Sequence, residues 1–448
     1  MDLSKQWLDQ GLALLTCPPA VPCIEVLQAY GILGHLSMQF EGFTGVSGSL
    51  LFFCSQMARK MGLHLIDMPA KREERRRGGA NLIEVEVKRR IWWHIVSTDW
   101  IMANMGGPQE GTYSLHPHQM KTNPPSNVED ENIPVGHSRL SEDEYSVPLG
   151  TTSTTVSYFI VRTKLATLFR EVIDNLPAGY FASPSSNVSV DMYETILSLD
   201  QRFMTFLKSL PPYFQLHSDI HMDTNNSNSN SNSNPLSWQR YLIHHNFHTQ
   251  LARLHRPFLI RGSSEPRFAY SRMQCIRSAE TVIEIHRAHF AQYPHLPRVH
   301  YMQHHLLMAT VVLTMDVCFN PDEIKAAARK ADLLAIFRIL EQEELAFSSA
   351  HHPSRAINRA VQVLRKMLDK NNICTLDKQE ASSLQLHPVH MQPVLEPIQL
   401  PETQQHQQQQ QPPSDDFWNE FIHYAPSFDV PDWGILFNNL DSQYSGLA

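Results

Sequence analysis

Apolar residues recur every three to four positions along most of the chain, which is the period of one face of an α-helix. No run of short alternating strands competes with this pattern, so we predict an all-α protein built from many helices. The expected helices are Ile24 to Met38, Leu50 to Met61, a helix within Val87 to Pro108, Thr155 to Leu176, Asp191 to Leu210, Leu236 to Leu254, Ser271 to His289, Met302 to Phe319, Asp322 to Leu345 and Ser354 to Asp369.

The segment VKRRIWWHIVSTDWIMANMGGP is apolar almost all round when it is placed on a helix, which predicts a core helix. Its three indoles would bury a large area against neighbouring helices. Asp99 is the exception, because an ionised carboxylate beside Trp92 and Trp100 is costly to bury. We therefore expect it to have a fixed partner, either a cation from another helix or backbone N–H groups. An effector-binding carboxylate is the alternative.

Polar segments divide the predicted helices into two lobes with disordered inserts. TNNSNSNSNSN cannot bury apolar area, and QQHQQQQQPP is of low complexity, so both should be disordered. An acidic, Pro-rich stretch should form a surface connection between the lobes. The predicted divisions are a first helical part at 1–125, an acidic linker at 126–150, a helical lobe at 151–370 with a disordered insert at 222–235, a Gln-rich disordered linker at 371–413 and an acidic-aromatic tail at 414–448.

Composition changes this picture little, but it bears on nucleic-acid binding. The 448 residues are 42% hydrophobic and 18% charged, with a formal net charge of −8. This charge gives no global attraction to a polyanion, so DNA contact would need a local basic patch. The only dense basic run, KREERRR from Lys71 to Arg77, is interrupted by two glutamates. A solvated face is favoured there over a localisation or phosphate-binding signal.

The six cysteines do not form a metal-binding pattern, because no two are two to four residues apart. We predict free thiols in a reducing compartment and no zinc site or other cofactor in this chain. His244 and His248 stand one helical turn apart, which suits a metal, but no third ligand accompanies them. We expect them on ordinary polar surface.

No motif for catalysis or membrane association stands out. GVSGS at Gly45 to Ser49 falls one residue short of a nucleophile elbow and has no strand before it. Phosphate-binding glycine loops are absent, and we predict that the chain is not an enzyme. LHRPF is expected to be a helix end, because Pro257 cannot continue the preceding helix. No apolar run reaches about 18 residues, so no membrane contact is predicted.

Two segments carry a family resemblance. The first contains ARKMGLH, from Ala58 to His64, and continues with Glu86, Arg89, Arg90, Trp92, Trp93, Asp99, Gly107 and Pro108. The second is LARLHRPFLIRG, from Leu251 to Gly262, followed by Ser271 and Cys275. In order and spacing these residues resemble the fungal-specific transcription factor domain, the helical middle region of zinc binuclear-cluster regulators. The resemblance covers most of the chain from about Ile24 and implies a scaffold role for the tryptophan helix.

The chain departs from this family pattern at two points. The family usually has Gly-Arg-Pro where this sequence has Gly106-Gly107-Pro108. The six-cysteine DNA-binding cluster that usually precedes the domain is also missing from the sequence, together with its basic linker and coiled coil. We therefore expect either a truncated transcription factor or a regulator that works without its own finger. Zinc is expected only if such an N-terminal cluster exists.

The C-terminal tail has the most function-like pattern. Acidic residues alternate with aromatic and aliphatic ones, so that repulsion between acids keeps apolar groups available to a partner groove. Docking on the chain's own helical domain is the alternative. The expected partner-binding residues are Phe417, Trp418, Phe421, Trp433, Leu436 and Phe437.

Together these features predict a nuclear fungal transcription regulator with a regulatory helical domain and a C-terminal activation segment. Its expected partners are a transcriptional coactivator or another regulator, with a small-molecule effector also possible. DNA would be reached only through a missing N-terminal module or through a partner. The competing interpretation is a finger-less interaction protein that modulates another transcription factor.

Overall fold

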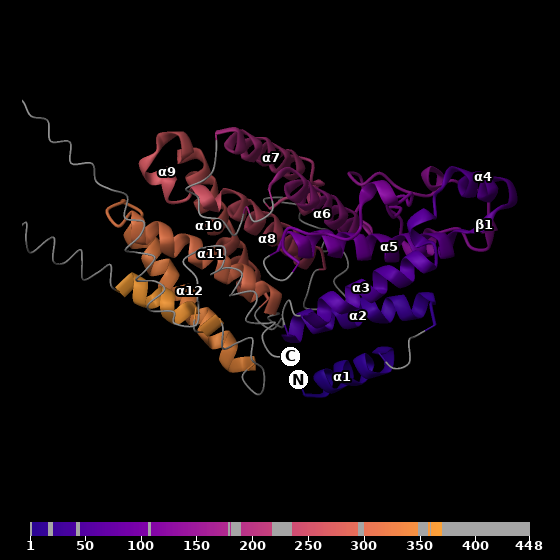
Figure 1. Cartoon of the computed structure of the whole chain (residues 1–448), viewed down its shortest axis with the longest axis horizontal. Coiled ribbons are helices and arrows are strands. Elements are labelled where there is room, and N and C mark those ends of the chain that lie inside the picture. Colours follow the sequence, from indigo (N-terminus) through magenta and orange to yellow (C-terminus); the bar gives the residue numbers. More distant parts are fainter. Residues whose placement is uncertain are drawn as a thin grey trace, which may run out of the picture.

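The computed structural model describes residues 2–16, 21–41, 45–105, 109–177, 180, 190–216, 235–293, 300–347, 357–358 and 360–369. Among these residues the only strands are β1 (Ala80–Asn81) and β2 (His137–Ser138), which pair antiparallel. The prediction of an all-α protein is confirmed. Figure 1 shows α4 at one end of the molecule and α12 at the other, with α6 and α8 between them.

The α-helices are α1 (Asp2–Thr16), α2 (Ile24–Glu41), α3 (Gly45–Lys60), α4 (Pro69–Gly78), α5 (Leu82–Ala103), α6 (Ser157–Asn175), α7 (Val190–Lys208), α8 (Pro235–His255), α9 (Arg261–Ser264), α10 (Ala269–Gln292), α11 (His300–Phe319) and α12 (Ala326–Phe347). Short 3₁₀ turns are η1 (Leu63–Leu65), η2 (Pro117–Gln119), η3 (Asp130–Asn132), η4 (Glu142–Glu144), η6 (Pro212–Phe214), η7 (Arg256–Phe258) and η8 (Pro266–Phe268). Residues 357–358 and 360–369 are also helical.

Local signals account for several helix ends. Gly62 follows α3 with a φ of 74°, a left-handed conformation that favours glycine, as its position in the sequence predicted. The side chain of Asn81 accepts a hydrogen bond from the N–H of Glu84 and caps α5. This cap starts the tryptophan helix at Leu82, before the basic triplet. Helix α8 ends at His255, just before Pro257, as predicted from LHRPF.

Helices α1 and α4 were not predicted. Helix α4 carries no buried residue, so it lacks the apolar periodicity by which helices are found in a sequence. Pro69 lies at its start, Gly79 follows it with a φ of 79°, and Glu73 pairs with Arg76 and Arg77 one turn away. The basic run KREERRR thus lies within α4, a helix at the surface with no buried residue.

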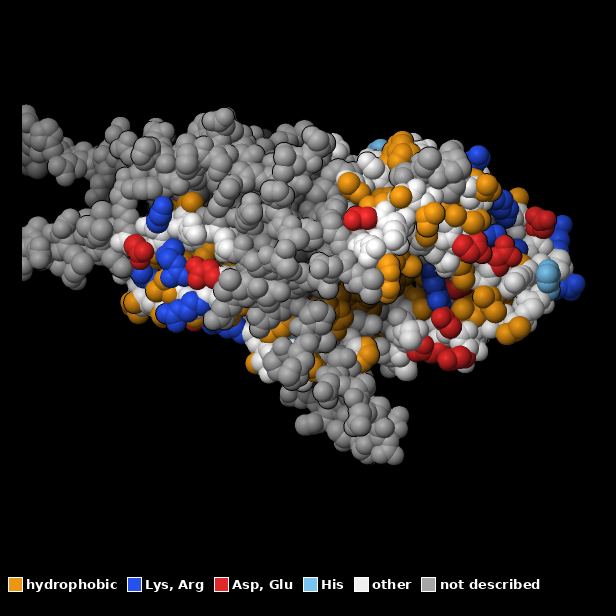
Figure 2. Space-filling view, turned by 90° about the horizontal axis from the view of Figure 1, so that it is seen from below, with side chains coloured by type: hydrophobic (Ala, Val, Ile, Leu, Met, Phe, Trp, Pro, Cys, Tyr) orange, Lys and Arg blue, Asp and Glu red, His pale blue; other side chains and the backbone are white. Residues whose placement is uncertain are grey.

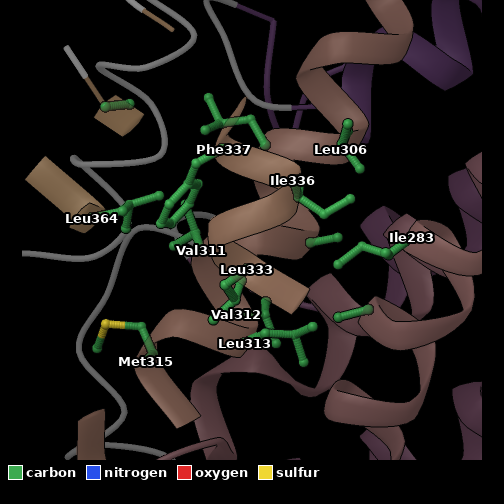
Figure 3. Packing of buried hydrophobic residues seen from close by; sticks show 14 of the residues in the cluster. Ile283, Leu306, Val311, Val312, Leu313, Met315, Leu333, Ile336, Phe337 and Leu364 are labelled. Atoms are coloured by element: carbon green, nitrogen blue, oxygen red, sulfur yellow. The ribbon is translucent and has the colours of Figure 1, made fainter. Parts of the chain in front are cut away.

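Three large apolar clusters hold the helices together. Helices α2, α3 and α5 form one, α6, α7 and α8 form the second, and α10, α11 and α12 form the third. Figure 3 shows the third, in which Phe337, Leu333 and Ile336 of α12 pack against α11. Helix α6 joins the first two clusters, because Ala166 belongs to the first and its neighbour Leu165 to the second.

Helix α11 lies in the middle of the third cluster. Its window Met302–Phe319 is long and apolar enough to cross a membrane, with a mean hydropathy of 1.2, but 83% of the window is buried inside the molecule. His304, His305 and Asp316 interrupt it, so it is not an unbroken apolar run. This is the pattern of a core helix.

The predicted surface connection at 126–150 is partly buried, which corrects the expectation that it runs over the surface. Ser126, Asn127 and Val128 are all buried. Asn127 donates from Nδ2 to the Val147 carbonyl at 3.1 Å, and its Oδ1 accepts hydrogen bonds from Thr154 and Ser157. The acidic side chains that suggested a linker form two runs, at 129–131 and 142–144, and the buried Ile133 lies between them. The division into lobes at this segment stays a prediction.

Candidate functional site

The first three charged residues of the α5 signature meet in one buried ionic network. Arg89 is 1% exposed and donates from Nε to Asp67 Oδ2 at 2.8 Å, and it also pairs with Glu142. Asp67 further accepts from Arg75 of α4 at 2.5 Å and from the N–H of Asn123 at 2.8 Å. The network therefore ties α4, α5 and the segment after α5 to one carboxylate.

Glu86 and Arg90 extend this network along α5. The buried carboxylate of Glu86 accepts from the Ser126 N–H at 2.9 Å and from Arg90 Nε at 3.2 Å. Arg90 also donates to Asp130 at 2.6 Å. Glu86 Oε2 and Arg89 Nη1 have no hydrogen-bond partner and lie 3.9 Å apart. All three signature residues form ion pairs within the molecule, and of the three only Arg90 is partly exposed to solvent.

The carboxylates of this network respond differently to burial. Burial alone would raise the pKa of Asp67, but the hydrogen bonds and charge of Arg89 outweigh it and lower the pKa. The same balance lowers the pKa of Glu142. Burial dominates for Glu86, whose pKa is raised despite the charges of Arg90 and Arg89. The partners of Asp67 thus favour its ionised form more than those of Glu86 favour its own.

The three indoles of α5 all donate to the segment that follows this helix. Trp93 Nε1 donates to the Asn123 carbonyl at 2.8 Å, and Trp100 Nε1 donates to the Leu115 carbonyl at 2.9 Å. Trp92 Nε1 lies 3.4 Å from the sulfur of Met120. The ring bodies are buried in the first apolar cluster. Each tryptophan therefore packs α5 and fixes the following segment with its N–H group.

Asp99 has a fixed partner, as the sequence predicted. The partner is a pair of backbone N–H groups. Its Oδ2 accepts the N–H groups of Ser114 at 2.9 Å and Leu115 at 2.8 Å. Burial raises the pKa of Asp99, and these two hydrogen bonds oppose that effect. Of the two predicted kinds of partner, the N–H groups rather than a paired cation contact the carboxylate.

The second motif segment forms the crossing of α8 and α10. His255 Nδ1 lies 2.9 Å from Ser271 Oγ, and its Nε2 lies 3.0 Å from Asp200 Oδ1. The Cys275 thiol donates to the Ala252 carbonyl at 3.3 Å. Tyr270 adds a hydrogen bond of 2.6 Å to the other oxygen of Asp200. These contacts lock α7, α8 and α10 together.

Asp200, His255 and Ser271 have the composition of a nucleophilic triad but not its accessibility. Ser271 and His255 are fully buried, and Ser271 Oγ also donates to Tyr193 at 3.1 Å. A nucleophile must reach a reacting atom in a substrate, which a hydroxyl enclosed at a helix crossing does not. The arrangement therefore serves packing. Sequence reasoning missed it, because the three residues are far apart in the chain.

The two motif segments also contact each other. Arg253 of α8 donates to the Asn104 carbonyl at the end of α5 and pairs with Glu110. The Asn104 side chain donates to Gln250 at 3.2 Å. Residues Gly107 and Pro108 lie outside the described residues, as do the tail residues Phe417, Trp418, Phe421, Trp433, Leu436 and Phe437. Arg253 therefore joins both halves of the family pattern.

The prediction of ordinary polar surface for His244 and His248 is wrong. His244 is buried, donates from Nε2 to the Phe214 carbonyl at 2.7 Å, and stacks with the half-buried His248. Burial and the neighbouring His244 lower the pKa of His248 to about 3. Within the described residues no group of three or more His, Cys, Asp or Glu side chains could hold a metal ion.

Lysine and arginine do not gather into one basic patch on the face seen in Figure 2. That view shows them mixed with Asp and Glu at the end of the molecule where α4 lies. Arg75 is directed inward to Asp67 and to the Ile66 carbonyl, and Arg77 pairs with Glu73. The α4 helix therefore has neither the uniform charge nor the free arginines of a DNA-reading element.

A cavity of about 250 Å³ lies beside α5, where the first and second halves of the chain meet. Its walls are mostly apolar, with His35, Thr98, Arg162 and Asn246 among the polar groups. The lining residues are His35, Met38, Thr98, Ile101, Met102, Met105, Tyr158, Arg162, Leu165, Trp238, Leu242, Ile243, Asn246 and Met302. Sequence reasoning did not find this cavity, because five helices each contribute only a few residues.

Comparison with known proteins places these features in context. The chain is 32% identical over 437 residues to the probable transcription factor lepB of Aspergillus flavus, which covers 94% of this chain and 74% of that protein. It is also 32% identical over 362 residues to the agnestins biosynthesis cluster transcription factor of Paecilomyces divaricatus, covering 80% of this chain and 48% of that protein. A weaker similarity, 23% over 202 residues, links it to the Zn(2)-C6 fungal-type transcription factor pigI of Monascus ruber, covering 44% of this chain and 22% of that protein.

No family model matches the chain, and no solved structure matches it. The similarity to the Aspergillus flavus protein nevertheless runs through both motif segments and nearly the whole length of the chain. The buried contacts of Arg89, Asp99, His255 and Arg253 show that these segments form one connected scaffold. On this similarity, the chain belongs to a family of fungal transcription factors.

Proposed function

We propose that this chain is the regulatory part of a nuclear fungal transcription regulator, with no enzymatic activity of its own. The observation that carries the proposal is the 32% identity to a probable transcription factor over 94% of the chain. The helical domain is the scaffold, and the tail at 414–448 recruits a transcriptional coactivator or another regulator. The alternation of acids and aromatic residues in the tail supports this role.

DNA is reached in this proposal by a module other than the described helices. A zinc cluster is one candidate, because one relative is named as a Zn(2)-C6 factor. A DNA-binding partner is the other, which would make the chain a finger-less modulator. Burial raises the pKa of the thiols of Cys54 and Cys318 to about 12, which disfavours the thiolate forms that bind metal.

A fusion of the full chain to a foreign DNA-binding domain tests the proposal in a fungal reporter strain. We expect activation, because the tail supplies apolar anchors to a partner groove. Joint alanine replacement of the six tail residues Phe417, Trp418, Phe421, Trp433, Leu436 and Phe437 should remove most of the activity at unchanged protein level.

The matched control replaces four polar residues of the same tail, Asn438, Asn439, Ser442 and Gln443, with alanine. This control keeps the acids and the aromatic residues, so its activity should stay close to that of the parent fusion. A silent parent fusion, with the tail protected from proteolysis, would identify the tail as a docked structural segment. Mapping the 5′ end of the natural transcript then separates a zinc-cluster regulator from a finger-less modulator.

A further inference from the structure

The cavity beside α5 has the size of a small ligand site rather than of a packing defect. Its volume of about 250 Å³ approaches the ~300 Å³ at the lower end of ligand pockets and is far larger than a single water. A ligand of roughly ten to twenty non-hydrogen atoms fits this size class. The walls come from α2, α5, α6, α8 and α11, so a bound molecule would contact helices from both halves of the chain.

The walls favour an apolar body of variable shape. Four methionines line the cavity, and methionine adapts to irregular apolar surfaces because its side chain is unbranched and polarisable. Trp238 and Tyr158 add aromatic surface. Met102, Met105 and Met302 are buried, so their side chains are held in place around the space.

One end of the cavity carries a positive charge. Arg162 of α6 is half-buried, and it donates to the hydroxyl of Ser97 and, at 3.0 Å, to the hydroxyl of Thr98. These contacts orient the guanidinium group toward α5. A planar guanidinium binds a carboxylate through two parallel hydrogen bonds, and partial burial strengthens that attraction.

The cavity is also continuous with the contacts that join the two motif segments. Met105 lines it and follows Asn104, whose carbonyl accepts from Arg253 of α8. Asn246 lines it one turn before Gln250, which accepts from the Asn104 side chain. A ligand held between α5 and α8 would therefore add contacts at the same junction that Arg253 bridges.

We propose that this cavity binds a small amphiphilic monocarboxylate, with its carboxylate on Arg162 and its apolar body among the methionines and Trp238. Binding adds contacts between α2, α5, α6, α8 and α11 and so stabilises one arrangement of the two halves. As an effector site it rests on the proposed regulatory function, whereas the binding itself does not.

Calorimetry and thermal unfolding of the full chain test the binding with two pairs of probes. Decanoate is compared with decan-1-ol, and 2-naphthoate with 2-naphthol, so that each carboxylate has a neutral counterpart of similar shape. We expect at least one carboxylate to bind about tenfold or more tightly than its alcohol and to raise the Tm. Equal binding of carboxylate and alcohol in both pairs, or no binding by any probe, overturns the proposal.

Variants assign the binding to the cavity. Arg162→Met should weaken carboxylate binding about tenfold and leave alcohol binding within about threefold, because the charge matters only to the carboxylate, whereas the loss of the hydrogen bonds to Ser97 and Thr98 affects both probes alike. Leu242→Trp fills the cavity and should abolish binding of both probes. The matched control is Lys164→Met, which removes an exposed charge from the same helix, outside the cavity. An Arg162→Met protein that is folded and binds carboxylates as well as the parent would refute the assignment.

Regulation is measured separately with the reporter fusion. Adding the tighter carboxylate should change reporter output in the parent fusion and in Lys164→Met, but not in Leu242→Trp. Binding without any change in output would reject the effector role while leaving the ligand site in place. A silent parent fusion would contradict the proposed function instead, and the binding measurements would stand unaffected.

Discussion

Two buried aspartates illustrate how the surroundings of a single residue set its chemistry. Asp67 lies against the guanidinium groups of Arg89 and Arg75, and its pKa is lowered although burial opposes this. The carboxylate of Asp99 accepts hydrogen bonds from the neutral backbone N–H groups of Ser114 and Leu115, and burial raises its pKa. The same side chain is therefore stabilised as an anion in one place and penalised as an anion in the other.

Replacing Asp99 should separate its hydrogen bonds from its charge. Asp99→Ala removes the acceptor of the buried Leu115 N–H and of the more exposed Ser114 N–H, and it should lower the free energy of unfolding by about 1 to 3 kcal/mol. Asp99→Asn keeps an acceptor oxygen and should cost less. Because the folded pKa of Asp99 is raised, its contribution is favourable at low pH and is lost as the pH rises through the folded pKa. In urea unfolding, the free energy of unfolding of Asp99→Asn should therefore rise relative to that of the parent as the pH increases. Equal losses of unfolding free energy in Asp99→Ala and Asp99→Asn would contradict this expectation.

Asp67 should show the opposite dependence on pH. Asp67→Asn leaves the buried Arg89 without its main counter-charge and should cost about 3 to 5 kcal/mol at neutral pH. The folded pKa of Asp67 is lowered, so the stability it contributes is present above the unfolded pKa and is lost as the pH falls through the folded pKa. The difference in the free energy of unfolding between the parent and Asp67→Asn should therefore become smaller at acidic pH. An unchanged gap, measured by denaturant unfolding between neutral and acidic pH, would show that the ion pair is not the cause.

At the scale of elements, α5 is a core helix that also holds the segment after it in place. Its apolar sides are buried in the first cluster, and its indole N–H groups and Asp99 hold the segment that follows it. In this segment, the backbone N–H of Ser126 donates to Glu86 of α5, and the backbone N–H of Asn123 donates to Asp67. The helix and its following segment therefore form one unit.

Removing one indole should show how much of this unit depends on packing. Trp92 is 1% exposed, so Trp92→Ala leaves a large cavity and should cost about 3 to 5 kcal/mol. Trp7 of α1 is 62% exposed and serves as the matched control. Trp7→Ala should change stability by about 0.5 kcal/mol or less. Thermal unfolding compares the two, and similar Tm values for both variants would rule out α5 as a core helix.

At the scale of the whole molecule, charge and cysteine placement limit what this chain does alone. The formal net charge is −8, and the basic residues of α4 are paired with acids or turned inward. The described cysteines Cys23, Cys54, Cys275 and Cys318 form no disulfide bond with one another and lie on separate segments. In the proposed function, sequence-specific DNA binding is therefore assigned to another module.

The purified chain should therefore neither shift duplex DNA in a sequence-specific way at physiological salt nor keep stoichiometric zinc after dialysis. Electrophoretic shifts with competitor DNA and metal analysis by mass spectrometry measure these two properties. The expectation follows from the negative net charge, from the pairing of the α4 arginines with acids and from the lack of closely spaced cysteines in the sequence. A specific shift, or one bound zinc per chain, would contradict it.

The sequence by itself determined the helical class, most of the helices and the core role of the tryptophan segment. These depend on local periodicity, on Gly62 as a helix end and on Pro257 as a helix breaker, all of which act over a few residues. It also required a partner for Asp99, because the cost of burying a carboxylate does not depend on the fold. Helix α4 escaped prediction, since a helix without a buried face has no apolar period.

Only the tertiary structure decided which partners were used. Asp67 and Arg89 are 22 residues apart in the chain, and His255 meets Asp200 across 55 residues. The cavity beside α5 draws its walls from five helices, so no segment of the sequence carries its pattern. Periodicity states which face of a helix is buried, but not which helix covers it. That choice depends on how all the apolar faces and buried charges are satisfied together, which a one-dimensional pattern does not contain.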